Sequence, residues 1–283
     1  DSPSGYTRKV TVYLLEEYAR LGYSAKRTVK GGVIAEIGGE GDPILTMAHV
    51  DTLGAVAAEI KSNGRLRLSP VGGFNANNAE AHNCRVYTYD GQIYEGTIQL
   101  ADASLHVNKE YSTTQRTFQS VEVVLDEPVT SKDDVKALGI TNGCFVCADP
   151  NLVVTNSGYI KSRFLDDKLS AAILLGYAKY IRENNITPLR KVYQHMTVFE
   201  EVGHGACASI PEDVTELLSV DMGCVGDGLE CTERQVSICA KDGHGPYNYQ
   251  VTTGLVNAAK KDSIDYAVDI YPFYGSDADA ALS

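Results

Sequence analysis

The sequence predicts an α/β fold that is interrupted by a small β domain. Helical patterns alternate with buried strand patterns at both ends of the chain, which is typical of layered α/β domains. Between them lie short alternating runs broken by turn residues, as in small all-β modules. We therefore expect one α/β domain made of residues 1–57 and 158–283, split by an inserted β domain at residues 58–157.

The first segment predicts a helix and then two strands. Residues 8–21 place apolar side chains at helical spacing, and Gly22 follows as a C-terminal stop. Extended runs at residues 32–37 and 44–50 are separated by a glycine-rich turn at 38–43. The short turn predicts that these two strands pair with each other.

The middle of the chain changes to short strands. They begin near residue 57, continue through 143–147 and end near 156–158. The predicted strands cover residues 65–68, 85–89, 92–100, 117–125 and 143–147.

Longer elements return after the insertion. We expect helices at residues 168–181 and 248–260, and strands at 192–199, 217–221 and 266–270.

Composition excludes several classes of partner. With 37 acidic and 25 basic residues, the net charge is -12, which disfavours nucleic acid and anionic membrane surfaces. The longest apolar run, residues 171–175, is far shorter than a membrane span. Seven cysteines in a chain of this size indicate reduced thiols, so we expect a soluble cytoplasmic protein. The chain begins at Asp1 rather than Met and shows no leader pattern, so trimming at either end stays open.

Several residues suited to metal chemistry follow predicted strands. His49 ends an apolar strand and Asp51 shares its face, a pairing in which a carboxylate orients a metal-binding histidine. Glu200 and Glu201 follow a buried strand, so one could bind metal while the other acts as a base. Asp221 ends a third strand. Taken alone, each has a commoner explanation: His49 could simply bond to a neighbouring acid, and the glutamates could lie in a solvated turn. Ligands gathered at matching strand ends nevertheless indicate one site.

Asp166 and Asp167 directly precede a predicted helix. They could simply cap its amides and complement its dipole. Alternatively, Asp166 bridges two metal ions in the same site.

A rival interpretation is dinucleotide binding. Residues 203–208 match the pattern GxGxxA after a strand, and Asp221 lies near the position of a ribose-binding acid. However, Glu200 and Glu201 would repel a pyrophosphate, and Pro211 interrupts the helix that should bind it. We therefore disfavour this alternative.

The remaining candidates have simpler explanations. Cys144 and Cys147 have zinc-knuckle spacing, but no second pair follows, so we expect them to pack inside a strand. His195 lies mid-strand and is expected to be a core histidine with satisfied hydrogen bonds. The sequence contains no GxSxG elbow and no P-loop, which argues against covalent catalysis and phosphoryl transfer.

The order of these motifs resembles the tetrahedral (TET) or glutamyl-aminopeptidase family of dinuclear metallopeptidases, some of which carry an endoglucanase label. The similarity spans nearly the whole chain, including the insertion. The motifs are residues 2–5, 48–51, 162–168, 199–203, 220–221 and 274–278.

The resemblance implies a three-layer sandwich of a mixed, mostly parallel sheet with helices on both faces, as in zinc peptidases. It implies a PDZ-like barrel as the insertion, serving oligomerisation and substrate access, and homo-oligomers from dimers to tetrahedral dodecamers. The expected activity is release of N-terminal residues from short peptides that have a free N-terminus. The expected cofactors are two divalent ions of zinc, cobalt or manganese.

The resemblance also assigns roles to residues. Asp166 would bridge both metals, His49 and Asp221 would complete one site, and Glu201 would bind the other. Glu200 would be the general base.

Further expectations concern the surroundings of the site. Asp51 would support catalysis by orienting His49, and a cis peptide bond would join Asp166 to Asp167. Ser276 and Asp277 would contact substrate.

One departure opens an alternative. The family's fifth ligand is a histidine near the C-terminus, whereas no histidine follows His244 in this sequence. If the end is trimmed, the protein is an ordinary member. If Ser283 is the true end, the Glu201 site lacks a ligand unless His204 or a neighbouring subunit replaces it. The alternative function is a non-catalytic peptide-binding or assembly subunit with an incomplete metal site.

Overall fold

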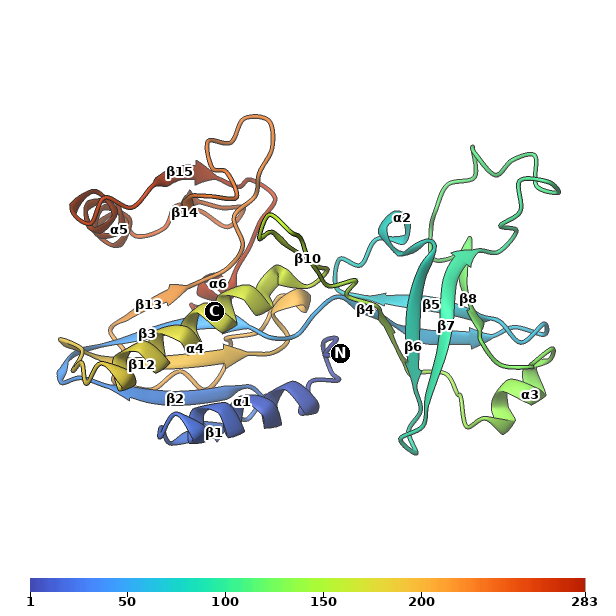
Figure 1. Cartoon of the computed structure of the whole chain (residues 1–283), viewed down its shortest axis with the longest axis horizontal. Coiled ribbons are helices and arrows are strands. Elements are labelled where there is room, and N and C mark those ends of the chain that lie inside the picture. Colours follow the sequence, from blue (N-terminus) through green and yellow to red (C-terminus); the bar gives the residue numbers. More distant parts are fainter. Residues whose placement is uncertain (283) are drawn as a thin grey trace. The chain divides into compact units, whose positions relative to one another are not determined.

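The computed structural model describes residues 1–282 and contains two compact units (Figure 1). The first unit comprises Asp1–Leu14 and Val50–Phe164. The second comprises Leu15–His49 and the chain from Leu165 onward.

A mixed five-stranded sheet forms the centre of the second unit. β3 runs parallel to both β12 and β13, whereas β2 runs antiparallel to β1 and β12. β14 and β15 form a separate parallel pair. The order in the main sheet is β1 (Ala25–Arg27), β2 (Val33–Gly38), β12 (Arg190–Thr197), β3 (Gly41–His49) and β13 (Glu216–Ser219), and the pair is β14 (Val236–Lys241) with β15 (Tyr266–Ile270).

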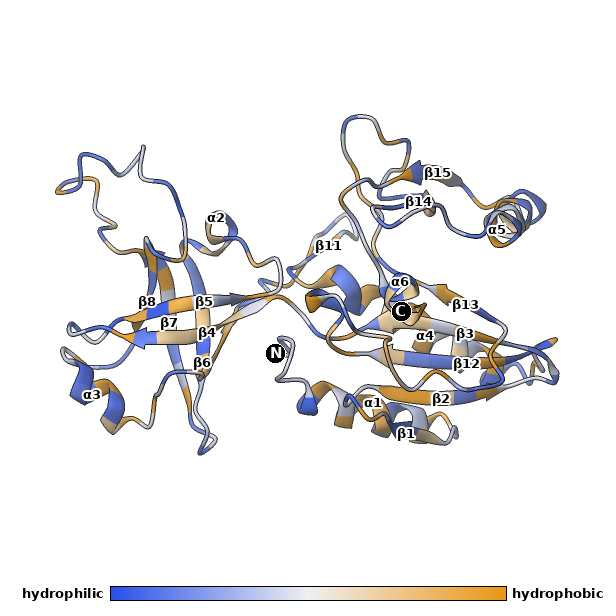
Figure 2. Ribbon diagram, turned by 180° about the vertical axis from the view of Figure 1, so that it is seen from behind, coloured by the Kyte–Doolittle hydropathy of each residue, from blue (hydrophilic) through white to orange (hydrophobic). Residues whose placement is uncertain are grey.

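Helices cover both faces of this sheet, as predicted. α1 (Arg8–Arg20) and α4 (Leu165–Glu183) share one face, where the Tyr18 hydroxyl donates to Gln194 Oε1 and Gln194 Nε2 donates to the Leu174 carbonyl, both at 2.8 Å. On the other face, Ala281 of α6 (Asp277–Ala281) packs against the cluster that contains Leu45 and Met47. Figure 2 shows the hydrophobic residues of β2, which are buried in this core.

The prediction that the strands at residues 32–37 and 44–50, now β2 and β3, pair with each other is wrong. β12 lies between β2 and β3, and Arg190 is in register with Gly41. Two glycines admit the incoming chain: a Cβ on Gly39 would lie 1.8 Å from the Arg190 carbonyl oxygen, and one on Gly41 would lie 2.3 Å from that of Leu189. Any larger residue would block this insertion.

The first unit contains a closed six-stranded barrel, in agreement with the all-β module that the sequence predicts and the barrel that the resemblance implies. Its strands alternate between buried and exposed positions, and the inward side chains form a continuous apolar core. Five of the strands were predicted. The barrel order is β4 (Gly54–Ile60), β5 (Leu66–Val71), β8 (Val121–Leu125), β7 (Ile93–Leu100), β6 (His82–Tyr87) and β9 (Phe145–Ala148).

Short elements complete the chain. Of these, only the 13-residue helix α5 was predicted; the others are too short to show a recognisable period. They are α2 (Ala76–Ala79), α3 (Lys132–Ala137), the hairpin β10 (Val153–Val154) with β11 (Ile160–Lys161), the 3₁₀ helix η1 (Glu200–Val202) and α5 (Tyr249–Lys261). In the described chain, no helix has both the length and the apolar character that crossing a membrane requires.

Cys144 and Cys147 are buried near and within β9, in agreement with the packing role expected for them. His195 is also buried, but the expectation of satisfied hydrogen bonds is wrong, because its Nδ1 atom has no partner among the described residues.

Burial of His195 predicts an acid-sensitive core. Burial, reinforced by the charge of Lys30, lowers the pKa of His195 to about 4 from an ordinary 6.5. The folded state therefore resists a proton that the unfolded chain accepts, and stability falls as pH drops from about 6.5 to about 4, by up to ~3 kcal/mol.

Urea denaturation between pH 7 and pH 4 tests this for the His195→Gln variant. Its stability should decline less steeply with acid than that of the unmodified chain. The exposed His106→Gln variant is the control and should follow the unmodified chain. Parallel curves for His195→Gln and the unmodified chain would contradict the prediction.

Candidate metal centre

One edge of the main sheet collects the ends of three parallel strands. Thr197 at the end of β12 is in register with His49 at the end of β3, and β13 ends beside them at Ser219. In open α/β sheets, ligands bind outside the carboxyl ends of the strands. As the sequence predicts, one edge of the sheet therefore carries the residues at or just after these strand ends, which are His49, Glu200, Glu201 and Asp221.

A strained turn presents the two glutamates. Glu200 and Glu201 lie in η1, which is flanked by Phe199 and Gly203, both with left-handed backbone (φ 72° and 83°). A left-handed conformation at Phe199 is unfavourable for a residue with a Cβ, so the surrounding structure must hold it.

Two aspartates open α4. Asp166 and Asp167 have non-helical backbone angles, and the predicted cis bond between them is confirmed. Asp166 Oδ1 lies 3.0 Å from His49 Nε2, while Asp167 Oδ2 accepts the His49 backbone N–H at 3.1 Å.

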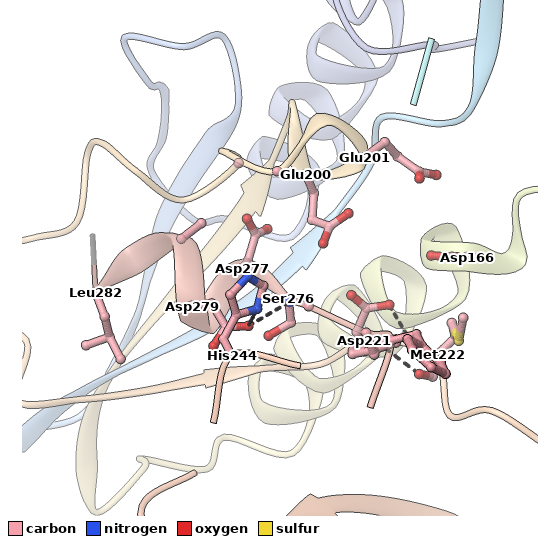
Figure 3. Close-up of a pocket in the computed structure, with 16 residues that line it drawn as sticks. Asp166, Glu200, Glu201, Asp221, Met222, His244, Ser276, Asp277, Asp279 and Leu282 are labelled. Atoms are coloured by element: carbon pink, nitrogen blue, oxygen red, sulfur yellow. Dashed lines mark hydrogen bonds and ion pairs between the residues drawn. The ribbon is translucent and has the colours of Figure 1, made fainter. Parts of the chain in front are cut away.

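The structure brings all four predicted metal ligands together. Figure 3 shows three of them, Asp166, Glu201 and Asp221. His49, Asp166 and Glu201 form one group whose ligand atoms lie within 4.8 Å of one another, and His49, Asp167 and Asp221 form another. His49 is thus common to both groups. Asp167 is a candidate ligand that sequence reasoning did not propose, although its place beside Asp166 is a signal that both carboxylates lie near the site.

The charges of the centre are poorly balanced. Burial, together with neighbouring carboxylates, raises the pKa of Glu200 to about 8 and that of Asp167 to about 8, and it also raises the pKa of Asp221. Burial alone would lower the pKa of His49, but its contact with Asp166 and the surrounding acids raise it to about 11. Without a bound cation, protons held by these acids reduce the negative charge of the cluster. A divalent cation would neutralise that charge more effectively.

The residues fit a divalent cation. Asp167 Oδ1 is buried and has no hydrogen-bond partner among the described residues. Carboxylate oxygens and an imidazole nitrogen are ligands that zinc, cobalt and manganese accept. A dication would both satisfy this oxygen and reduce the repulsion.

A cavity of about 720 Å³ opens onto the centre, which is room enough for a small peptide. Its lining includes no Lys or Arg side chain, so it is strongly acidic. The carboxylates and the imidazole that line it belong to Asp166, Glu200, Glu201, Asp221, His244, Asp277 and Asp279.

The remaining predicted site residues lie as follows. Asp51 is buried in the first unit, where the Ser4 hydroxyl donates to Asp51 Oδ2 at 2.5 Å. Ser276 lines the cavity as the N-cap of α6. Asp277 also lines it, but this side chain is only 1% exposed.

The two extra histidines differ in position. His204 stacks on Phe199, with ring centroids 5.3 Å apart, and belongs to none of the potential ligand groups within residues 1–282. His244 lines the cavity, with Nδ1 3.4 Å from Asp279 Oδ2, and was not predicted there.

The segment proposed for a dinucleotide has no phosphate-binding helix. Residues 203–215 form turns and irregular structure up to β13. This geometry agrees with the preference against that alternative.

The chain is similar in sequence to known proteins. A model of the family described as M42 glutamyl aminopeptidase matches residues 31–283. YhfE of Bacillus subtilis (strain 168), named as an aminopeptidase, is 43% identical over 283 residues, covering 99% of this chain and 82% of that relative.

Two solved structures have the same fold. The TET aminopeptidase from the marine sediment archaeon Thaumarchaeota archaeon SCGC AB-539-E09 has a TM-score of 0.89 at 20% identity, covering 99% of this chain and 80% of that chain. The TET1 peptidase of Pyrococcus horikoshii, described as able to assemble into a tetrahedron or a large octahedral shell, has a TM-score of 0.85 at 24% identity, covering 99% and 83%.

Removal of one carboxylate should change stability in opposite directions with and without metal. Asp221→Asn removes repulsion, so its melting temperature in chelator should be at or above that of the unmodified chain. Metal at 100 times its Kd should stabilise the unmodified chain by about 2.7 kcal/mol, and the variant by clearly less at the same concentration.

Thermal unfolding in chelator and in zinc, cobalt or manganese measures both effects. Glu212→Gln alters an exposed carboxylate and serves as the matched control. An equal response to metal in Asp221→Asn and the unmodified chain would remove Asp221 from the ligand set.

Proposed function

Because the chain belongs to the M42 glutamyl aminopeptidase family, as its motifs predict, we propose that it is an aminopeptidase that uses two divalent metal ions to release N-terminal residues from short peptides. The observation that carries the proposal is the meeting of His49, Asp166, Glu201 and Asp221 beside one acidic cavity. Peptidases of this family depend on metal, and this donor set suits zinc, cobalt or manganese.

The four ligands have distinct proposed roles. Asp166 would hold both ions, His49 and Asp221 would complete one site, and Glu201 would complete the other. When bound, the ions lower the pKa of a water molecule and polarise the scissile carbonyl. Asp51, placed just after His49 in the chain, would keep that histidine oriented.

Glu200 is the proposed general base. Its Oε2 atom lies 3.6 Å from His49 Nε2, so its carboxylate faces the metal ligands. It would take the proton of the attacking water and pass it to the leaving amine. Burial, with a smaller contribution from nearby acids, raises the pKa of Glu200 in the metal-free chain. Bound cations would lower that pKa again and so favour the carboxylate form that accepts a proton.

The acidic cavity favours an unblocked peptide. A protonated N-terminal amine gains from the many carboxylates and meets no opposing Lys or Arg in the lining. Attraction of this amine places the first peptide bond at the centre, which supports cleavage from the N-terminus. Ser276 lines the same cavity and is the substrate contact that we retain.

We also propose that the protein is a homo-oligomer. The similar TET1 peptidase assembles into closed shells, and the inserted domain at residues 58–157 would contribute to assembly and substrate access. The closed barrel described above lies in this part of the chain, and its first strand, β4, begins at Gly54, ahead of the proposed boundary.

Glu200→Gln should abolish most activity while retaining metal. The amide cannot accept the proton, so kcat should fall by about 10²- to 10⁴-fold. Hydrolysis of unblocked aminoacyl-p-nitroanilides with acidic, basic and apolar first residues measures this effect, and elemental analysis measures the metal. Chelation should stop hydrolysis by the unmodified chain.

Glu212→Gln and N-acetylated substrates are the controls. The first should leave activity unchanged, and the second should resist cleavage. Failure of the metal-loaded chain to cleave any free-amine substrate would overturn the proposed function and favour the non-catalytic alternative.

A further inference from the structure

We propose that Asp277 is a positioning residue that holds the turn bearing Glu200 and Glu201, rather than a group that contacts substrate. This inference rests on the proposed function, because it concerns how the proposed base and ligand are oriented. It replaces the role that the motif alone suggested.

The Asp277 carboxylate joins the two ends of the turn. The Thr197 hydroxyl, at the end of β12, donates to Asp277 Oδ2. The Ala206 backbone N–H donates to Asp277 Oδ1 at 2.8 Å. Residues 198–205, which contain the two glutamates, are therefore closed into a loop by one side chain.

The turn has little support of its own. η1 has three residues and no side-chain cap at Phe199, and short 3₁₀ segments have poor hydrogen-bond geometry. Its internal bonds include Gly203 N–H to the Glu200 carbonyl at 2.6 Å and His204 N–H to the Phe199 carbonyl at 3.1 Å. External anchoring at both ends compensates for the unfavourable backbone at Phe199.

The packing around Asp277 independently supports this role. A Cβ on Gly205 would lie 2.2 Å from Asp277 Oδ1, so glycine is required there for the carboxylate to reach Ala206. Thr197, Ala206 and Asp277 are all almost completely buried. Figure 3 shows the Asp277 side chain directed toward the segment that bears Glu200.

The start of α6 holds Asp277 itself in place. The Ser276 hydroxyl accepts from the Ala278 N–H at 3.2 Å, and Asp279 Oδ2 accepts the Ser276 N–H at 3.0 Å. This capping box fixes the helix terminus from which the Asp277 carboxylate projects. The anchor is thus rigid on both sides.

Comparison of Asp277→Asn with Asp277→Ala tests the proposal. The amide can keep both contacts, since its oxygen accepts from Ala206 and its NH₂ donates to the Thr197 hydroxyl. Asp277→Ala should lose roughly 10- to 100-fold in kcat with little change in KM, and Asp277→Asn should recover most of that loss. If Asp277 instead bound the substrate amine by charge, both variants would raise KM alike, which would overturn the proposal.

Hydrogen exchange separates this inference from the proposed function. A peptide covering residues 199–208 reports the Ala206 amide, which should exchange faster in Asp277→Ala and stay protected in Asp277→Asn, whether or not the chain is active. Unchanged exchange of the Ala206 amide in Asp277→Ala would overturn the inference. If that amide loses protection as expected but the unmodified chain has no peptidase activity, only the proposed function is overturned. Should Asp277→Ala fail to fold, Thr197→Val removes one of the same contacts, and Asp227→Ala is an exposed control.

Discussion

The repulsion among buried carboxylates at one edge of the sheet is the constraint on which the rest of the site depends. Burial is the main cause of the raised pKa of Glu200, Asp167 and Asp221, and neighbouring carboxylates add to it. His49 is common to the two ligand groups that contain the predicted ligands. Such a cluster is unfavourable in an isolated chain. It persists because each acid is attached to a separate element whose own packing is favourable, so that no single segment can relax away from the others.

Apolar packing below the edge supplies that support. Leu45 and Met47 of β3 and Met196 of β12 are fully buried, and the buried Gln194 side chain links the sheet to α1 and α4 through two hydrogen bonds. Movement of a strand to separate the acids would break this core. This packing also holds the ligand atoms close together before a cation binds. Binding then requires no large rearrangement, so little of the binding free energy is lost.

The sequence predicts which side chains meet at the site better than it predicts the contacts that hold them there. His49, Glu200, Glu201 and Asp221 were found because strand ends can be read from apolar runs, and parallel strands deliver their ends to one edge. The barrel and the main helices follow from the same periodicities. The pairing of β2 with β3 was predicted wrongly because insertion of β12 depends on glycines at 39 and 41, whose contacts with residues 189 and 190 lie far away in the chain. The sequence did not predict the places of Asp167 and His244 at the site or the short helix α6. Their positions depend on tertiary contacts rather than on a local pattern.

Asp277 and Gly205 illustrate the difference between a residue's chemical type and its proposed role. An aspartate in a motif beside a metal centre suggests contact with ligand, yet this carboxylate lies within the fold and accepts hydrogen bonds from Thr197 and Ala206. Gly205 has no reactive group, but its missing Cβ is what admits that carboxylate. The two positions therefore form one unit: a larger residue at 205 would displace the acid, and loss of the acid would leave Thr197 and the Ala206 amide buried without this acceptor. The orientation of Glu200 thus depends on a glycine and an aspartate that perform none of the proposed chemistry themselves.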